Sequence, residues 1–177
     1  MAVYILLFRG VGGKTQLPVK TLREGLTELG FESVGTYINS GNAYLKTSKS
    51  RAEVLRSTAQ FCSKKLGFDK DIYAVSLPEW RKLIANNPFP KAARATPKYV
   101  HAAVLAKKPD PKDLATVQSF AVPGEAIEIV DKVAYLHTPF GFGSSKLAEK
   151  FDSKIGVPNT ARNWNSVLKL LELAEGL

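Results

Sequence analysis

Val3-Tyr4-Ile5-Leu6-Leu7-Phe8 is an unbroken apolar run, and it indicates a strand at the centre of a β-sheet. A strand with one face in water alternates apolar and polar residues, whereas a strand covered on both faces is apolar throughout. A second long apolar stretch, Tyr99 to Ala106, indicates a second central strand. The order of the elements around each stretch then indicates the fold.

The elements around the first run follow the order strand, helix, strand, strand, helix, strand. Apolar residues at helical spacing from Val19 to Leu29 predict a helix between Pro18 and Gly30. Asn39-Ser40-Gly41-Asn42 separates two strands, because these residue types tolerate the left-handed backbone of a tight turn. In chain order we predict strand 3–8, helix 18–30, strands 34–38 and 43–45, a helix with Leu55, Ala59, Cys62 and Leu66 on its apolar face, strand 72–75 and helix 77–84.

The rest of the chain repeats this order of elements without repeating the residues. We predict strand 99–106, helix 111–120, strands 126–130 and 133–137, helix 147–155, a short strand 160–162 and a final helix from about Asn163. A strand-helix-strand-strand-helix-strand unit is the ferredoxin-like arrangement. The sequence therefore predicts an α+β protein of two tandem ferredoxin-like halves, each βαββαβ plus an extra helix with an antiparallel sheet. The halves are expected at 1–86 and 99–177, with a connection at 87–98.

The predicted topology brings separate loops together at one edge of each sheet. In the ferredoxin-like order 4-1-3-2, strands 1 and 2 run parallel, so their C-terminal ends share an edge. We therefore expect the loop Arg9–Lys14 beside the turn Asn39–Asn42, with Lys70 at the same edge. By the repeat, four residues are expected to gather at the corresponding edge of the second half: Lys107, Lys108, Lys132 and Asn159.

The charge balance favours anionic partners without concentrating in one segment. The 177 residues include 25 Lys and Arg against 16 Asp and Glu, a net charge of +9, and 45% of them are apolar. This composition is typical of a globular protein and excludes fibrous, low-complexity and disordered classes. A basic balance favours phosphorylated ligands and nucleic acid, although it also serves solubility alone.

Cysteine content and hydropathy point to the cytoplasm. Cys62 is the only cysteine, so the chain forms no internal disulfide and no multi-cysteine zinc site. The apolar run at 3–8 is too short for a signal peptide or a membrane span. We therefore expect a cytoplasmic protein that does not enter a membrane.

Phe8-Arg9-Gly10-Val11-Gly12-Gly13-Lys14-Thr15 is the first candidate binding segment. Its glycines expose backbone N–H groups ahead of a helix, where anions are stabilised. A Walker A loop would need glycine in place of Phe8, and a dinucleotide fingerprint would need glycine in place of Thr15, so neither motif is present. The structural alternative is a flexible turn that enters the helix.

Two further segments have the same double interpretation. Asn39, Ser40 and Asn42 offer donors to an anion, while turn chemistry explains them equally well. Arg162 and Asn163 precede the last helix, whose N-terminus favours anions, and Asn163 also suits a helix N-cap. The predicted ligand-binding residues of the three segments are Arg9, Gly12, Gly13, Lys14, Asn39, Ser40, Asn42, Arg162 and Asn163.

Catalytic chemistry has few candidates in this sequence. His101 and His137 lie in predicted strands with no nucleophile or carboxylate at triad spacing. Cys62 falls on an apolar helix face, which is typical of a core residue. No His, Asp and Glu cluster has metal-ligand spacing, and no segment has the signature of an RNA-recognition module. We predict no metal and no cofactor, and the residues leave enzymatic activity open.

Four stretches together resemble the motifs of a known family: Arg9 to Lys14, Thr36-Tyr37-Ile38-Asn39-Ser40-Gly41-Asn42, Asn87-Pro88-Phe89 and Thr160 to Val167. The family is the bacterial domain of unknown function 1697, and the resemblance covers nearly the whole chain. It implies two decorated ferredoxin-like halves and no established activity. The first loop of the family usually reads Arg-Gly-Ile-Asn-Val-Gly-Gly, and the Ile-Asn pair is missing here.

Three functional hypotheses follow from these residues. The first is a binding protein for a phosphorylated ligand, nucleotide or nucleic acid, with Arg9, Lys14, Asn39, Asn42 and Arg162 as donors. The second is an enzyme on a phosphorylated small molecule, in which the same groups stabilise developing charge. The third is an interaction module that forms a homodimer through an exposed sheet edge and binds no ligand.

Overall fold

The computed structural model describes all residues, 1–177, and divides into two compact units. The first unit comprises Met1–Lys82 and Lys169–Leu177, and the second comprises Leu83–Leu168. No helix in either unit combines the length and the apolar character that crossing a membrane requires.

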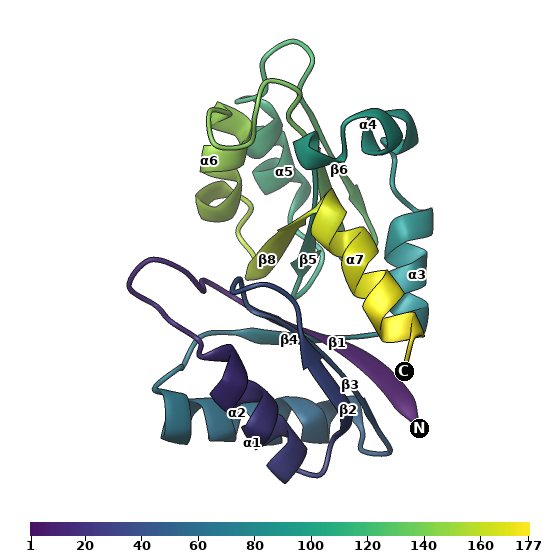
Figure 1. The fold of residues 1–177 in the computed structure, drawn as a ribbon. Helices are drawn as coiled ribbons and strands as arrows, with labels where there is room; N and C mark the ends of the chain where they lie inside the picture. Colours follow the sequence, from purple (N-terminus) through teal and green to yellow (C-terminus); the bar gives the residue numbers. More distant parts are fainter. The chain divides into compact units, whose positions relative to one another are not determined.

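The first unit is built on a four-stranded antiparallel sheet in the order β2-β3-β1-β4. Two helices cover one face of this sheet (Figure 1). Its elements are β1 (Ala2–Phe8), α1 (Val19–Glu28), β2 (Glu32–Thr36), β3 (Asn42–Thr47), α2 (Arg51–Leu66) and β4 (Ile72–Ser76). The predicted central strand is β1, because β3 and β4 pair with it on either side.

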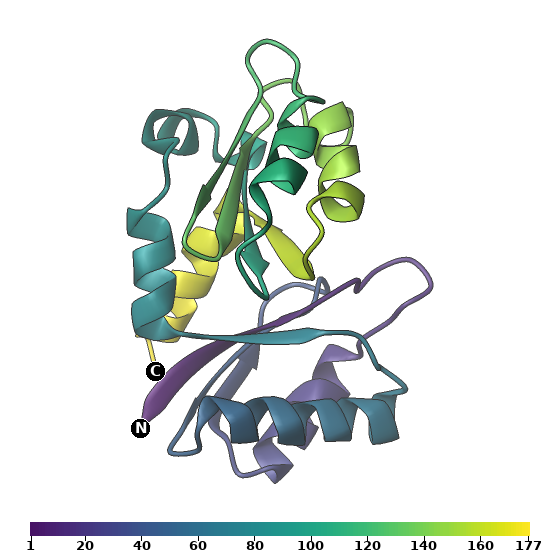
Figure 2. The same ribbon diagram turned by 180° about the vertical axis from the view of Figure 1, so that it is seen from behind.

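The second unit repeats the arrangement with a sheet in the order β6-β7-β5-β8. Seen from behind, α5 and α6 cover one face of this sheet and α4 lies on the other side (Figure 2). Its elements are α4 (Pro90–Ala95), the 3-10 helix Pro97–Tyr99, β5 (Val100–Leu105), α5 (Pro111–Gln118), β6 (Ala126–Val130), β7 (Val133–His137), α6 (Lys146–Lys154) and β8 (Asn159–Asn163). Two helices contribute residues to both units: α3 (Leu77–Ala85) and α7 (Trp164–Glu175).

The predicted fold class is confirmed. Both sheets have the ferredoxin-like strand order, and the two apolar runs form their inner strands β1 and β5. In the first unit, Leu6 and Phe8 of β1 pack with Leu22 and Leu26 of α1. In the second, Ala103 and Leu105 of β5 pack with helix residues of the same unit, among them Val117, Leu147, Phe151 and Ile155.

The buried face of α2 matches the predicted one only in part. Val54, Thr58 and Cys62 are its buried residues, whereas Ala59 is exposed. Ser50 and Glu53 form a complete capping box at the N-terminus, and Gly67 ends the helix in the left-handed conformation. The prediction is confirmed for Cys62, and the partly buried Leu55 and Leu66 also pack against the core; it was wrong for Ala59 and missed Val54 and Thr58.

Two other segments differ from the prediction. The expected strand 34–38 is β2, Glu32–Thr36, which ends earlier because Ile38 has a φ of 47° that no strand residue adopts. The stretch 87–98 contains α4, which begins at Pro90, a residue whose fixed φ suits the first helical turn. Proline is common both in connecting segments and at the first position of a helix. The proline-rich composition of 87–98 therefore did not reveal the helix that begins at Pro90.

Candidate functional site

Three loops meet at one edge of the first sheet, as the topology predicts. They are the glycine loop (residues 9–15), the asparagine turn (residues 37–42) and the segment before β4. The backbone N–H of Phe8 donates to the Gly41 carbonyl at 2.8 Å, and the N–H of Arg9 donates to the Asp71 carbonyl at 3.0 Å. Lys70 Nζ donates to the Gly10 carbonyl at 3.2 Å. We call this region the loop edge.

The tip of the glycine loop is a tight turn with open surroundings. Gly12 and Thr15 exchange two backbone hydrogen bonds, of 2.8 and 3.0 Å, around Gly13 and Lys14. The N–H groups of these two central residues therefore take no part in the closing bonds. Gln16 Nε2 donates a hydrogen bond to the Gly13 carbonyl at 2.7 Å. The space beside both glycines is open, since a Cβ built on Gly12 or Gly13 would meet nothing within 4 Å. The tip thus presents backbone donors to solvent.

Basic side chains surround this loop, and their acidic neighbours neutralise them only in part. Arg9 Nη1 lies 3.8 Å from an Asp71 carboxylate oxygen, which is a long ion pair. The Arg9 side chain is 32% exposed and the Asp71 side chain 58% exposed, so water screens this pair. Lys70 Nζ also reaches Thr15 Oγ1 at 3.1 Å, so it fastens both ends of the loop. Lys14 is exposed at the tip. The loop edge therefore combines three cations with unpaired turn amides.

The asparagine turn uses part of its polar side chains for its own structure. Asn42 is 2% exposed, and its Nδ2 donates to Ser40 Oγ at 2.9 Å and to the Tyr37 carbonyl at 3.3 Å. Asn39 is exposed, and Ser40 is half-buried. Of the three predicted residues, Asn39 has the most accessible side chain, whereas the Asn42 amide holds the turn.

Arg162 and Asn163 lie in β8 of the second unit. Arg162 is 9% exposed, and its Nη1 donates to Thr160 Oγ1 at 2.7 Å and to the Ala161 carbonyl at 2.8 Å. Burial lowers the pKa of Arg162 to about 10. Asn163 Oδ1 accepts from the Asn165 N–H at 3.0 Å, and its Nδ2 donates to the Lys98 carbonyl at 2.9 Å. The N-cap interpretation of Asn163 is therefore confirmed.

The corresponding edge of the second sheet also forms. The N–H of Leu105 donates to the Lys132 carbonyl and that of Ala106 to the Pro158 carbonyl, both at 2.9 Å. Lys107, Lys108 and Lys132 are exposed there. Asn159 is buried instead, and its Nδ2 donates to Asp152 Oδ1 at 3.1 Å and to the Val157 carbonyl at 3.3 Å, so it serves the architecture.

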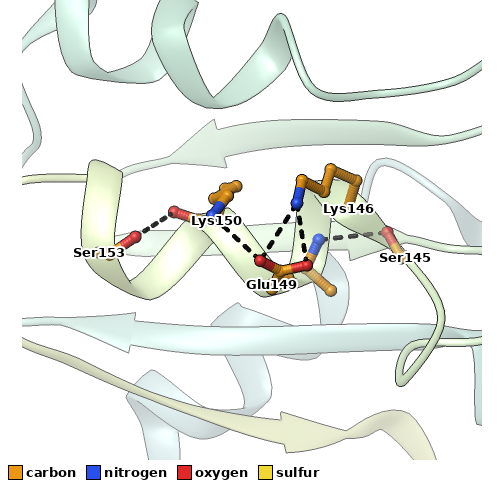
Figure 3. Close-up of polar contacts among 6 residues, drawn as sticks. Ser145, Lys146, Glu149, Lys150 and Ser153 are labelled. Atoms are coloured by element: carbon orange, nitrogen blue, oxygen red, sulfur yellow. Dashed lines mark hydrogen bonds and ion pairs between the residues drawn. The ribbon is translucent and has the colours of Figure 1, made fainter.

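The sequence predicts no binding site in the glycine-containing loop before α6, although this loop precedes a helix with basic residues. In the structure Ser145 Oγ caps this helix by accepting from the Ala148 N–H at 3.1 Å. Lys146 and Lys150 both pair with Glu149, at 3.3 and 3.0 Å (Figure 3). These partners lower the pKa of the Glu149 carboxyl. The two lysines are therefore engaged by Glu149, unlike Lys14 at the loop edge.

Nucleophilic catalysis and a metal centre find no support in the described residues. Cys62 is fully buried, and burial raises the pKa of its thiol to about 12, so a thiolate does not form near neutral pH. His101 is buried against Phe142, with ring centroids 3.9 Å apart, and its Nδ1 has no hydrogen-bond partner. No group of three or more His, Cys, Asp and Glu side chains could hold a metal ion.

One feature of the loop edge could not have been found in the sequence. Ile38 adopts the left-handed backbone region and leaves its side chain 51% exposed. A β-branched residue before a turn normally indicates a strand, so the pattern pointed away from this conformation. Lys70 was placed at the edge from topology, but its two hydrogen bonds to the glycine loop had no signal in the sequence.

Fold and loops together define an α+β protein of two tandem ferredoxin-like units with a basic loop edge on the first. The chain belongs to the family described as Protein of unknown function (DUF1697), whose model matches residues 1–135. The glycine loop and the asparagine turn fall within the match, and the stretch Thr160 to Val167 falls beyond it.

A solved structure has the same fold. The conserved bacterial protein SP0830 from Streptococcus pneumoniae is similar to this chain with a TM-score of 0.69 and 24% identity, over 98% of each chain. At this identity the likeness supports the architecture alone. Among curated proteins the chain has no match.

Proposed function

We propose that this protein is a cytoplasmic binding protein for a phosphorylated ligand, which it holds at the loop edge of the first unit. The observation that carries the proposal is the exposed turn at Gly12–Thr15. This turn contains Lys14, Lys70 bonds to its last residue, and Arg9 lies in the same loop. Two exposed turn amides and three cations are the donors that a phosphate group prefers. Buried Cys62 and the absence of a disulfide suit a reducing compartment.

The charges at the loop edge favour an anion over a neutral ligand. Two hydrogen bonds to the glycine loop position Lys70, and Arg9 lies beside Asp71, so a ligand there has less side-chain order to impose. Lys14 adds an exposed charge at the tip. A phosphate group is then bound by preorganised donors and by one cation that closes over it.

A thermal-shift screen tests the proposal with inorganic phosphate, ribose 5-phosphate, AMP and a short 5′-phosphorylated oligoribonucleotide. A ligand at about 100 times its Kd stabilises the folded chain by roughly 2.7 kcal/mol, which is a readily measured shift. We expect at least one phosphorylated probe to raise the Tm. The double variant Arg9→Ala Lys14→Ala is expected to lose that shift, since it removes two of the three cations of the proposed site.

The matched control removes two charges elsewhere on the same unit. Lys64 and Lys65 are exposed in the last turn of α2, so Lys64→Ala Lys65→Ala keeps the net charge equal to that of the test variant. If both double variants weaken binding equally, the attraction is general rather than local, and the site assignment is wrong. If no probe shifts the Tm at low salt, the interaction-module hypothesis takes the place of the binding proposal.

A further inference from the structure

Ile38 has a backbone conformation that isoleucine rarely adopts. Its φ is 47°, in the left-handed region where a β-branched side chain crowds the backbone. Its side chain is also 51% exposed, so burial does not offset the strain. The asparagine turn therefore contains a residue that is unfavourable to the fold both in its backbone and in its exposed apolar surface.

The neighbouring residues impose this conformation. The Tyr37 N–H donates to the Asn42 carbonyl at 3.1 Å, and Asn42 Nδ2 donates back to the Tyr37 carbonyl at 3.3 Å. Gly41 fits tightly against β1, since a Cβ built there would lie 2.7 Å from the Phe8 carbonyl oxygen. With both flanks fixed, Ile38 has no room to relax into the extended region.

The turn does not itself require an isoleucine. Asparagine enters the left-handed region with less strain and is a common turn residue. Strained residues that the surrounding fold over-determines cluster at binding sites. Ile38 belongs to the same turn whose Gly41 also meets Val11 of the glycine loop, 2.8 Å from the built Cβ. Ile38 is therefore an exposed apolar residue in the turn that packs against the glycine loop.

We infer that Ile38 determines ligand specificity at the loop edge by covering the organic part of a phosphate ester, and that this ester is a nucleoside phosphate. The inference rests on the proposed function. Phosphate and sugar phosphates are polar throughout and offer nothing for an apolar side chain to cover, whereas a nucleobase has a flat face that packs on apolar groups. Arg9 and Lys14 hold the phosphate, and Ile38 contacts the base.

Calorimetric titration of the full chain with AMP, ribose 5-phosphate and inorganic phosphate tests this division. The wild type is expected to bind AMP about tenfold more tightly than ribose 5-phosphate, the gain of one buried aliphatic contact. Ile38→Asn is expected to remove this preference and to leave the ribose 5-phosphate affinity unchanged. The short 5′-phosphorylated oligoribonucleotide shows whether the nucleoside phosphate is free or the end of a nucleic acid, according to which of the two binds more tightly.

A stability measurement separates binding from folding. Because asparagine relieves the strain at φ 47°, Ile38→Asn is expected to raise the Tm by roughly 2–4 °C, so weaker AMP binding cannot come from unfolding. Equal affinities of the wild type for AMP and ribose 5-phosphate, or a variant that keeps the preference, would overturn the inference and leave phosphate binding intact. Absence of any phosphate binding by the wild type would overturn the proposed function and this inference with it. A fall in Tm would show that Ile38 is a structural residue, which also contradicts the inference.

Discussion

Acidification from pH 6.5 to pH 4 is expected to remove about 3 kcal/mol of the unfolding free energy of the second unit through His101 alone. Burial lowers the pKa of this imidazole to about 4 from the ordinary value of 6.5. The unfolded chain therefore binds a proton in this interval that the folded chain does not bind. Each pH unit then costs up to about 1.4 kcal/mol, and the loss levels off as the pH falls below the folded pKa.

The surroundings of His101 explain why its charged form is unfavourable. The ring stacks on Phe142 with an interplanar angle of 24°, and its Nδ1 has no partner to share a proton with. The residues opposite it on the neighbouring strands are Leu136 of β7 and Asn163 of β8, and neither is charged. An imidazolium here would be buried without a counter-charge.

Urea denaturation of wild type and His101→Phe between pH 4 and pH 7 measures this effect. The variant keeps an aromatic ring against Phe142 and does not titrate, so the difference between the two proteins isolates His101 from the carboxyl groups. We expect the wild-type free energy to fall more steeply with acid by about 3 kcal/mol over the interval. His101→Gln serves as a second, smaller variant, and parallel pH profiles for wild type and both variants would show that the His101 ring charges freely in the folded chain.

Gly41→Ala is expected to cost about 3 kcal/mol of unfolding free energy in the first unit. Part of the loss comes from the φ of 78°, which an alanine adopts at a cost of roughly 1–2 kcal/mol. The rest comes from the new Cβ, which would lie 2.7 Å from the Phe8 carbonyl oxygen and 2.8 Å from Val11 Cγ2. Because the Phe8 oxygen belongs to the backbone of a central strand, the turn has to move away.

Gly67→Ala is the matched control for this substitution. Gly67 has a φ of 62°, and no atom lies within 4 Å of its built Cβ, so alanine there meets the backbone penalty alone. Equilibrium unfolding in urea should give a loss of about 1 kcal/mol for the control and a clearly larger one for Gly41→Ala. Equal losses would mean that the asparagine turn does not press against β1, and the loop edge would lose its basis.

The apolar pattern of the sequence predicted the fold well because the two central strands are covered on both faces. Tyr4 to Phe8 are all buried, and β5 is buried except at Val104, so an unbroken apolar run was a reliable sign of position in the sheet. Topology then followed from element order, and it placed Lys70 beside the glycine loop. Part of the buried face of α2 was missed because Thr58, a polar residue, is fully buried there.

The detail of the loop edge depended on tertiary contacts that have no local signal. Asn42 and Arg162 had the composition of ligand donors, yet both are buried and bonded to neighbouring backbone or hydroxyl groups. Ile38 is β-branched like a typical strand residue, yet its φ is 47° and it lies in a turn. Asn42 and Arg162 bond to residues only one to five positions away, so what the sequence pattern lacked was which side chains the fold buries.

Backbone amide NMR during titration with AMP tests phosphate binding at the loop edge most directly. The account predicts that the Gly13 and Lys14 amides shift together and saturate with one Kd, because these are the turn amides proposed to donate to the phosphate. It also predicts that the same amides stay unmoved in Arg9→Ala Lys14→Ala at the same AMP concentration. Shifts confined to other residues, such as the first turn of α6, or the absence of any saturable shift, would contradict the account.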